Sequence, residues 1–145
     1  MKNILVALEL EDADFSKKLI SKAIEIAKAF DSKCWLIHIA APEPDFVGYE
    51  VGPQYIRDIL AEDLREEHKQ IQALAELVKT ETIDAEGLMI QGPTEEMILQ
   101  EIDKLNVDLL VLGNKKHGML YNTFVGSITN DLIQDVEIPV LLIPQ

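Results

Sequence analysis

The sequence has a single cysteine, Cys34, among its 145 residues. With one thiol, the chain can form neither an internal disulfide nor a metal site built from cysteines alone. The residues around Cys34 are apolar, so we expect a buried and unreactive thiol. The sequence therefore gives no support to a redox or thiolate-metal function.

Basic residues are also scarce, because 13 lysines and arginines stand against 26 aspartates and glutamates, for a formal net charge of −13. Such a charge repels the phosphates of nucleic acids and anionic lipid surfaces. No apolar run reaches the roughly 18 residues of a membrane span, and the first strand turns acidic at Glu9, too early for a signal peptide. We therefore expect a cytoplasmic protein that binds neither nucleic acid nor membrane.

The composition is that of a globular protein, with 48% hydrophobic and 27% charged residues. Apolar, β-prone runs predict five strands at residues 3–8, 33–40, 84–91, 107–112 and 138–143, and helical periodicity predicts four helices at residues 15–30, 54–80, 94–105 and 127–135. Strict alternation of strand and helix predicts an α/β fold, a doubly wound parallel sheet with helices on both faces. We expect one domain over residues 1–145.

In such sheets, ligands bind beyond the carboxyl ends of the strands, where the strand order reverses. The loop after the fourth strand contains Gly113 and runs directly into a helix, so the free amides near Gly126, Ser127 and Ile128 are suited to hold phosphates. Residues 115–117 add local positive charge in an acidic chain. A plainer interpretation is that Gly126 and Ser127 only turn the chain and cap the helix, and the residues leave both open.

The loop after the second strand, residues 42–54, contains three prolines and two glycines and has no sustained periodicity. Long loops of this kind are often functional. We expect the segment Pro42–Pro53, with Phe46 and Tyr49, to act either as a lid that nucleotide protects or as a connector that ignores the site.

Three other phosphate-site classes do not fit. A P-loop needs Lys-Ser/Thr after its last glycine, where residues 119–120 are Met-Leu, and a dinucleotide fingerprint needs glycines in the first turn, where Glu9–Asp12 stands. A receiver domain needs a phosphoacceptor aspartate after the third strand, where Gln91 stands, and a lysine after the fifth strand, which is absent.

Catalytic patterns are missing as well. Ser127 has no evident base, and the three histidines fit no zinc spacing. His38 is expected to close a buried strand and His68 to face solvent, which leaves His117 as the histidine in the candidate site. Glu95–Glu96 is interpreted as a helix start rather than a catalytic pair. We therefore predict a binding protein and not an enzyme.

Taken together, six segments resemble the universal stress protein family along nearly the whole chain. They are residues 2–7 (KNILVA), 36–39 (LIHI), 92–96 (GPTEE), 108–113 (DLLVLG), 126–127 (GS) and 138–143 (IPVLLI). The resemblance implies a Rossmann-like sheet of the adenine nucleotide alpha hydrolase-like type, with strand order 3-2-1-4-5. It also implies a stress-response regulator that binds ATP or AMP, with or without Mg²⁺.

The family's nucleotide-binding members carry Gly-x2-Gly-x9-Gly-Ser/Thr in the fourth-strand loop. Here Gly113 and Gly126–Ser127 stand at the matching total spacing, Lys116 replaces the second glycine, and Glu9 replaces the family's usual aspartate after the first strand. The resemblance implies a set of contacts by position: Ala7 and Glu9 beside the ribose, Ile39 against the adenine, Leu112 and Gly113 beneath the nucleoside, and Gly126, Ser127 and Ile128 at the phosphates.

Lys116 separates two functional hypotheses. Its ammonium either attracts the phosphates, or its side chain fills the space that a glycine would leave and obstructs them. In the second case the protein is a dimeric stress-response scaffold that has lost nucleotide binding and acts through contacts with an unknown protein partner. In both cases we expect a homodimer through the last strand, Ile138–Ile143, because it is apolar and lies at the sheet edge in this strand order.

Overall fold

The computed structural model describes the backbone of residues 1–40, 54–114 and 126–145, and the side chains of these residues except 54–58 and 126–129. The strands are β1 (Asn3–Ala7), β2 (Lys33–Ala40), β3 (Ala85–Gln91), β4 (Leu109–Asn114) and β5 (Val140–Pro144). The helices are α1 (Ala13–Phe30), α2 (Gln54–Lys79), α3 (Thr94–Lys104) and α4 (Gly126–Asp135). The predicted alternation of strand and helix is confirmed.

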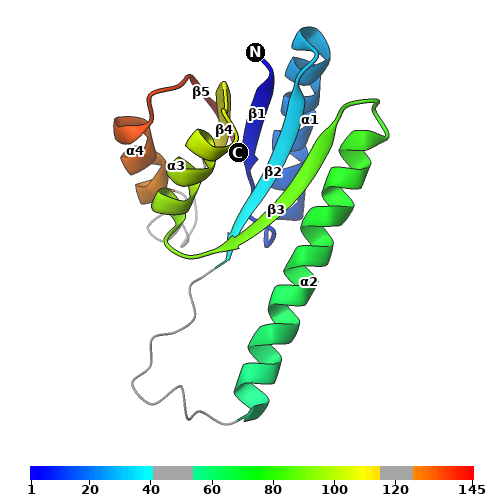
Figure 1. The fold of residues 1–145 in the computed structure, drawn as a ribbon, viewed down its shortest axis with the longest axis vertical. Helices are drawn as coiled ribbons and strands as arrows, with labels where there is room; N and C mark the ends of the chain where they lie inside the picture. Colours follow the sequence, from blue (N-terminus) through cyan, green and yellow to red (C-terminus); the bar gives the residue numbers. More distant parts are fainter. Residues whose placement is uncertain (41–53, 115–125) are drawn as a thin grey trace.

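All strand pairs are parallel, and the sheet has the order β3-β2-β1-β4-β5 (Figure 1). The expected order 3-2-1-4-5 is therefore confirmed. The order reverses at β1, which lies between β2 and β4, so the loops after β1 and β4 diverge at the same edge. This is the edge at which the sequence predicts a ligand.

β4 and β5 begin two residues later than the sequence predicts. The amide of Val107 donates to Ile102 of α3 at 3.0 Å, so residue 107 still completes the end of the preceding helix. Pro139 has no amide to donate, and its carbonyl only accepts from Leu110 at 3.0 Å. Pairing in the sheet then begins at Asp108, whose amide donates to Asn3 at 2.8 Å, and at the Pro139 carbonyl, one residue before each strand.

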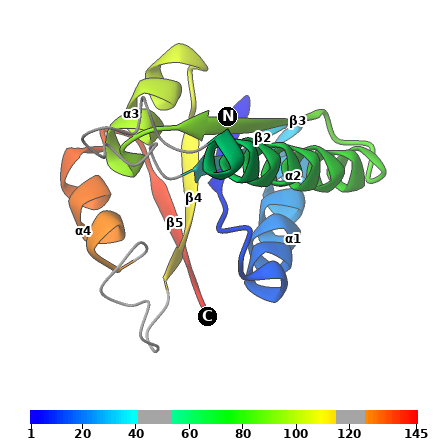
Figure 2. The same ribbon diagram turned by 90° about the horizontal axis from the view of Figure 1, so that it is seen from below.

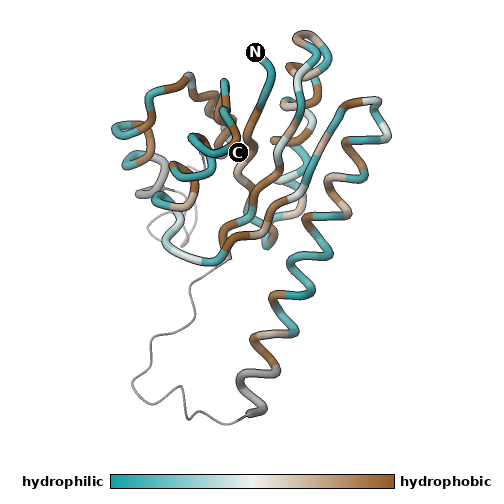
Figure 3. The backbone as a smooth tube through the Cα atoms, in the orientation of Figure 1, coloured by the Kyte–Doolittle hydropathy of each residue, from teal (hydrophilic) through white to brown (hydrophobic). Residues whose placement is uncertain are grey.

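Two helices cover each face of the sheet, and Figure 2 shows α1 and α2 on one side with α3 and α4 on the other. The core against α1 and α2 includes Ile4, Leu36 and Ile71, all at 0% exposure. The core against α3 and α4 includes Leu5, Ile37 and Leu110, also at 0%. In the hydropathy colouring of Figure 3, the strands at the centre of the molecule are mostly hydrophobic.

The long helix α2 lies close to β3 because of one glycine. A Cβ atom at Gly87 would stand 2.8 Å from the carbonyl oxygen of Ile71, so a larger residue would push the helix away. Gln72 of the same helix turn donates to the Gly87 carbonyl at 2.9 Å. These contacts hold α2 over the sheet and so determine what its side chains can reach on β2.

Candidate functional site

Three of the predicted nucleoside contacts lie at the carboxyl ends of the three central strands. Ala7 ends β1, Ile39 is the penultimate residue of β2, and Leu112 lies in the second half of β4. Ile39 and Leu112 are 4% and 5% exposed and belong to the core cluster that faces α3 and α4, and Ala7 packs against the same cluster. The structure thus brings these three residues to one face at one edge of the sheet.

The chain leaving β1 is held by its backbone. The amide of Leu8 donates to Ile37 at 2.9 Å, and the carbonyl of Glu9 accepts from the Ser16 hydroxyl at 2.7 Å. Asp12 then caps α1, because its Oδ1 atom accepts from the Phe15 amide at 3.1 Å. Glu9, which is half-buried, is therefore carried on a turn that α1 fixes beside the end of β1.

Gly113 is required for packing, which the sequence did not reveal. A Cβ atom there would overlap the ring of Phe15 and come within 2.8 Å of its Cζ atom. Phe15 enters from α1 and is 7% exposed. The glycine predicted to lie beneath a nucleoside therefore also makes room for an aromatic ring on the α1 face of the sheet.

Helix α4 begins at Gly126, one residue before the predicted start. Because α4 connects the carboxyl end of β4 to the start of β5, its first turn lies at the same edge as Ala7 and Ile39, on the lower side in Figure 1. The first amides of a helix have no partner within it, which fits the predicted role of Gly126, Ser127 and Ile128. The side chains of residues 126–129 are not described.

Some predicted residues cannot be placed. Lys116, with Lys115 and His117, lies outside the described residues, and so does the proposed lid with Phe46 and Tyr49. The predictions that rest on them stay predictions.

His38 lies near the end of the buried strand β2, as expected, and is 4% exposed. Its Nδ1 atom lies 3.2 Å from the Leu8 carbonyl oxygen, and its Nε2 atom lies 3.4 Å from Oε2 of Glu67 on α2. Sequence reasoning missed these contacts because no local pattern links β2 to a helix residue so far along the chain. His68 is exposed, as predicted.

Two further predictions about where ionisable groups lie are confirmed. Cys34 is buried, and that burial raises the pKa of its thiol to about 11, so the thiolate is disfavoured. Glu95 and Glu96 lie in the first turn of α3. A side-chain hydrogen bond with Asp135 of α4 raises the pKa of Glu95. This bond joins the start of α3 to the end of α4.

Among the described residues, no group of three acidic, histidine or cysteine side chains is placed to hold a metal ion.

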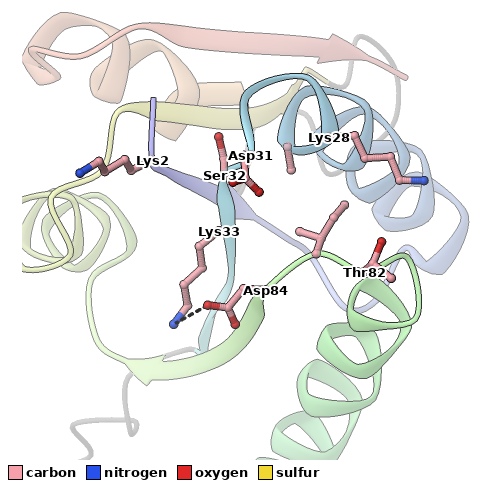
Figure 4. A pocket seen from close by; sticks show the side chains of 9 residues that line it. Lys2, Lys28, Asp31, Ser32, Lys33, Thr82 and Asp84 are labelled. Atoms are coloured by element: carbon pink, nitrogen blue, oxygen red, sulfur yellow. Dashed lines mark ion pairs between the residues drawn. The ribbon is translucent and has the colours of Figure 1, made fainter.

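A cavity of about 540 Å³ lies at the opposite end of the sheet, where β1, β2 and β3 begin (Figure 4). Its charged lining is largely paired: Lys33 lies 3.8 Å from Asp84 and 2.9 Å from Glu86, and Lys28 lies 2.7 Å from Glu81. None of the predicted site residues lines this cavity.

In the described ranges, no helix is both long and apolar enough to cross a bilayer.

Comparison with known proteins adds four findings, from a family model, one relative and two solved structures. The model of the universal stress protein family matches residues 1–144. A universal stress protein of Methanocaldococcus jannaschii is 30% identical over 142 residues, which cover 95% of this chain and 80% of that protein.

Among solved structures, universal stress protein UspA of Lactobacillus plantarum has a TM-score of 0.80 at 17% identity, covering 98% of this chain and 97% of that one. The universal stress protein of Archaeoglobus fulgidus in complex with dAMP has a TM-score of 0.70 at 16% identity, with coverages of 98% and 97%. At these identities the likeness establishes a shared fold.

Proposed function

This chain belongs to the universal stress protein family, and we propose that it is a stress-response regulator that binds ATP or AMP at the carboxyl edge of its sheet, without turnover. The observation that carries the proposal is the convergence of Ala7, Ile39 and Leu112 on one face beside the start of α4. Apolar side chains offer a surface for a purine ring, and helix amides offer donors for phosphates.

The choice of adenine rests on the family. The Archaeoglobus fulgidus relative was solved with dAMP, an adenine nucleotide, and has the same fold. In this chain, we assign the ribose to Ala7 and Glu9, the adenine to Ile39, and the nucleoside's lower face to Leu112 and Gly113. The phosphates then fall to Lys116 and to the first turn of α4, Gly126, Ser127 and Ile128.

Calorimetric titration with ATP, AMP, adenosine and GTP tests this function directly. We expect the three adenine compounds to bind and GTP to bind far more weakly, because the family likeness assigns adenine to this site. Repeating the ATP titration with and without Mg²⁺ shows whether the ion contributes. Absence of binding by all adenine compounds, together with no nucleotide in protein purified without additions, would refute the proposal.

The scaffold function is the second candidate, and one observation favours a role for assembly. Among the strands that the structure describes, β5 lies at the end of the sheet with β4 as its single neighbour, and Leu142 on it is 37% exposed. An apolar edge strand invites pairing with another copy. We propose that β5, which overlaps the predicted segment Ile138–Ile143, forms a homodimer whether or not nucleotide binds, and that the dimer works in the cytoplasm with a protein partner.

A further inference from the structure

A buried hydroxyl on helix α1 ties that helix to the loop after β1, which we define as residues 8–12 and call the β1 loop. Ser16 is 3% exposed, and its Oγ atom donates to the carbonyl oxygen of Glu9 at 2.7 Å. A serine inside a helix often bonds a carbonyl one turn earlier in the same helix. The carbonyl in that position, of Asp12, accepts from the Ser16 amide at 3.0 Å. The hydroxyl instead reaches beyond the helix to the β1 loop.

The Glu9 carbonyl is held from two sides. Besides the Ser16 hydroxyl, the amide of Asp12 donates to it at 3.3 Å. Just before it, the Leu8 amide donates to Ile37 of β2 at 2.9 Å. Because a peptide group is planar, fixing the direction of this carbonyl fixes the backbone torsion that follows the Cα atom of Glu9. The backbone around Glu9 is therefore attached to β2 on one side and to α1 on the other.

The first two turns of α1 are themselves attached to the sheet, so they can support the loop. The ring of Phe15 packs so closely on β4 that a Cβ atom at Gly113 would come within 2.8 Å of its Cζ atom. The ammonium group of Lys18 donates to the Pro144 carbonyl at the end of β5 at 2.6 Å. Ser16 lies between these two contacts along the helix. Its hydroxyl is therefore carried on a part of α1 that β4 and β5 hold in place.

We propose that Ser16 is a positioning residue for the ribose of the bound nucleotide, because its hydroxyl holds the Glu9 carbonyl and so sets where the Glu9 side chain stands. The proposal rests on the proposed function, in which Ala7 and Glu9 lie beside the ribose. An ionised carboxylate only accepts hydrogen bonds, and the ribose hydroxyls can donate them. A loop that is held beforehand does not have to be ordered when the ligand binds, so less affinity is lost. Ser16 acts in this way without touching the ligand.

The test compares ATP with 2′,3′-dideoxy-ATP, which lacks both ribose hydroxyls, in calorimetric titrations. We expect the parent to prefer ATP by about tenfold or more, the contribution of a hydrogen bond to a charged group. Ser16→Ala removes one oxygen atom and should weaken ATP binding roughly 2- to 10-fold, the net contribution of one neutral hydrogen bond, while dideoxy-ATP binding stays unchanged. Ser21→Ala is the matched control, because Ser21 is an exposed serine on the same helix, and it should bind both ligands like the parent.

A double-mutant cycle with Glu9→Ala tests whether Ser16 acts through Glu9. This variant keeps the carbonyl that accepts from Ser16 but lacks the carboxylate. Adding Ser16→Ala to it should cause no further loss of ATP affinity, because no side chain remains to be positioned. An equal loss in both backgrounds would overturn the positioning role, since Ser16 would then support the fold or another contact.

A second measurement needs no nucleotide. Hydrogen exchange of the Asp12 amide reports whether the Glu9 carbonyl, its acceptor, is held in place. We expect faster exchange of this amide in Ser16→Ala than in the parent. The Leu8 amide, which donates to β2, should exchange at its parent rate. Unchanged exchange at Asp12, or equally faster exchange at both amides, would overturn the role of the hydroxyl.

The outcomes separate this inference from the proposed function. If the parent binds no adenine nucleotide, the proposed function fails, and the ribose role of Ser16 fails with it. If the parent binds ATP and Ser16→Ala binds it equally well, the proposed function stands and the positioning role alone is wrong. A loss in Ser16→Ala that is the same for ATP and dideoxy-ATP would also overturn the positioning role, because it would not depend on the ribose hydroxyls.

Discussion

The two ends of the sheet differ in how far their polar groups are paired within the protein. At the amino end, Asp108 accepts from the amides of Lys2 and Asn3 at 2.7 and 2.9 Å. Lys28 and Lys33, which line the nearby cavity, are paired with carboxylates. At the carboxyl end, buried apolar residues lie beside a helix start whose amides have no partner within the helix. The amino end therefore pairs several of its own charged groups, while the carboxyl end is where we propose that the ligand binds.

The largest expected effect belongs to the carboxyl end. If Lys116 attracts phosphates, Lys116→Ala should weaken ATP binding roughly 10- to 150-fold, the equivalent of about 1.5–3 kcal/mol, because a charge-assisted hydrogen bond is lost. Adenosine binding should change little, and added salt should narrow the difference between the two ligands. Titrations at low and high salt measure this.

Lys116→Gly sharpens the same test, because it restores the family's glycine. On the attractive interpretation this variant binds ATP no better than the parent. Tighter ATP binding would instead identify the lysine side chain as an obstruction and would favour the scaffold function.

Gly113→Ala should destabilise the fold at the carboxyl end of the sheet by overpacking the core. The added Cβ overlaps the ring of Phe15, and overpacking of a core costs about 1–3 kcal/mol of unfolding free energy. Urea denaturation measures the loss. In a Phe15→Leu background the smaller side chain leaves room for the Cβ atom, so Gly113→Ala should cost clearly less there; an equal cost in both backgrounds would contradict the packing explanation.

Leu142→Lys tests whether the protein forms a dimer through β5. Pairing through β5 would bury Leu142, and a lysine there should weaken the dimer by about tenfold or more, because a buried charge is costly. Sedimentation at several protein concentrations measures the change. Exposed Ile133→Lys on α4 serves as the control surface substitution and should leave assembly unchanged.

The smallest effect is expected at the amino end. Backbone hydrogen bonds from Asn3 and Lys2 lower the pKa of Asp108. The Asp108 carboxyl group therefore binds a proton more weakly in the folded protein than in the unfolded chain. The carboxylate therefore stabilises the fold above its ordinary pKa, and this contribution is lost as the pH falls through the lowered value. Because the group is exposed, Asp108→Ala should cost less than about 1 kcal/mol at neutral pH. Thermal unfolding at pH 7 should show the difference, acid should abolish it, and ATP affinity should not respond.

Most of the fold could be predicted from the sequence because its signals are local. Apolar runs, helical periodicity and loop composition identified the nine elements of the described residues, and the burial of Cys34 and exposure of His68 followed from their neighbours. The starts of β4 and β5 were two residues off, because a strand begins where its backbone finds a ladder partner, and a hydrophobic pattern does not record that.

For the candidate site, the sequence by itself determined which loops and strand ends would meet, since parallel strands place their carboxyl ends at one edge. Only the tertiary structure decided the contacts between distant segments: Phe15 against Gly113, Ile71 against Gly87, and His38 between Leu8 and Glu67. Each depends on how closely a helix approaches the sheet and on the direction of a side chain. These quantities are set by packing across the whole core, so no residue pattern along the chain specifies them.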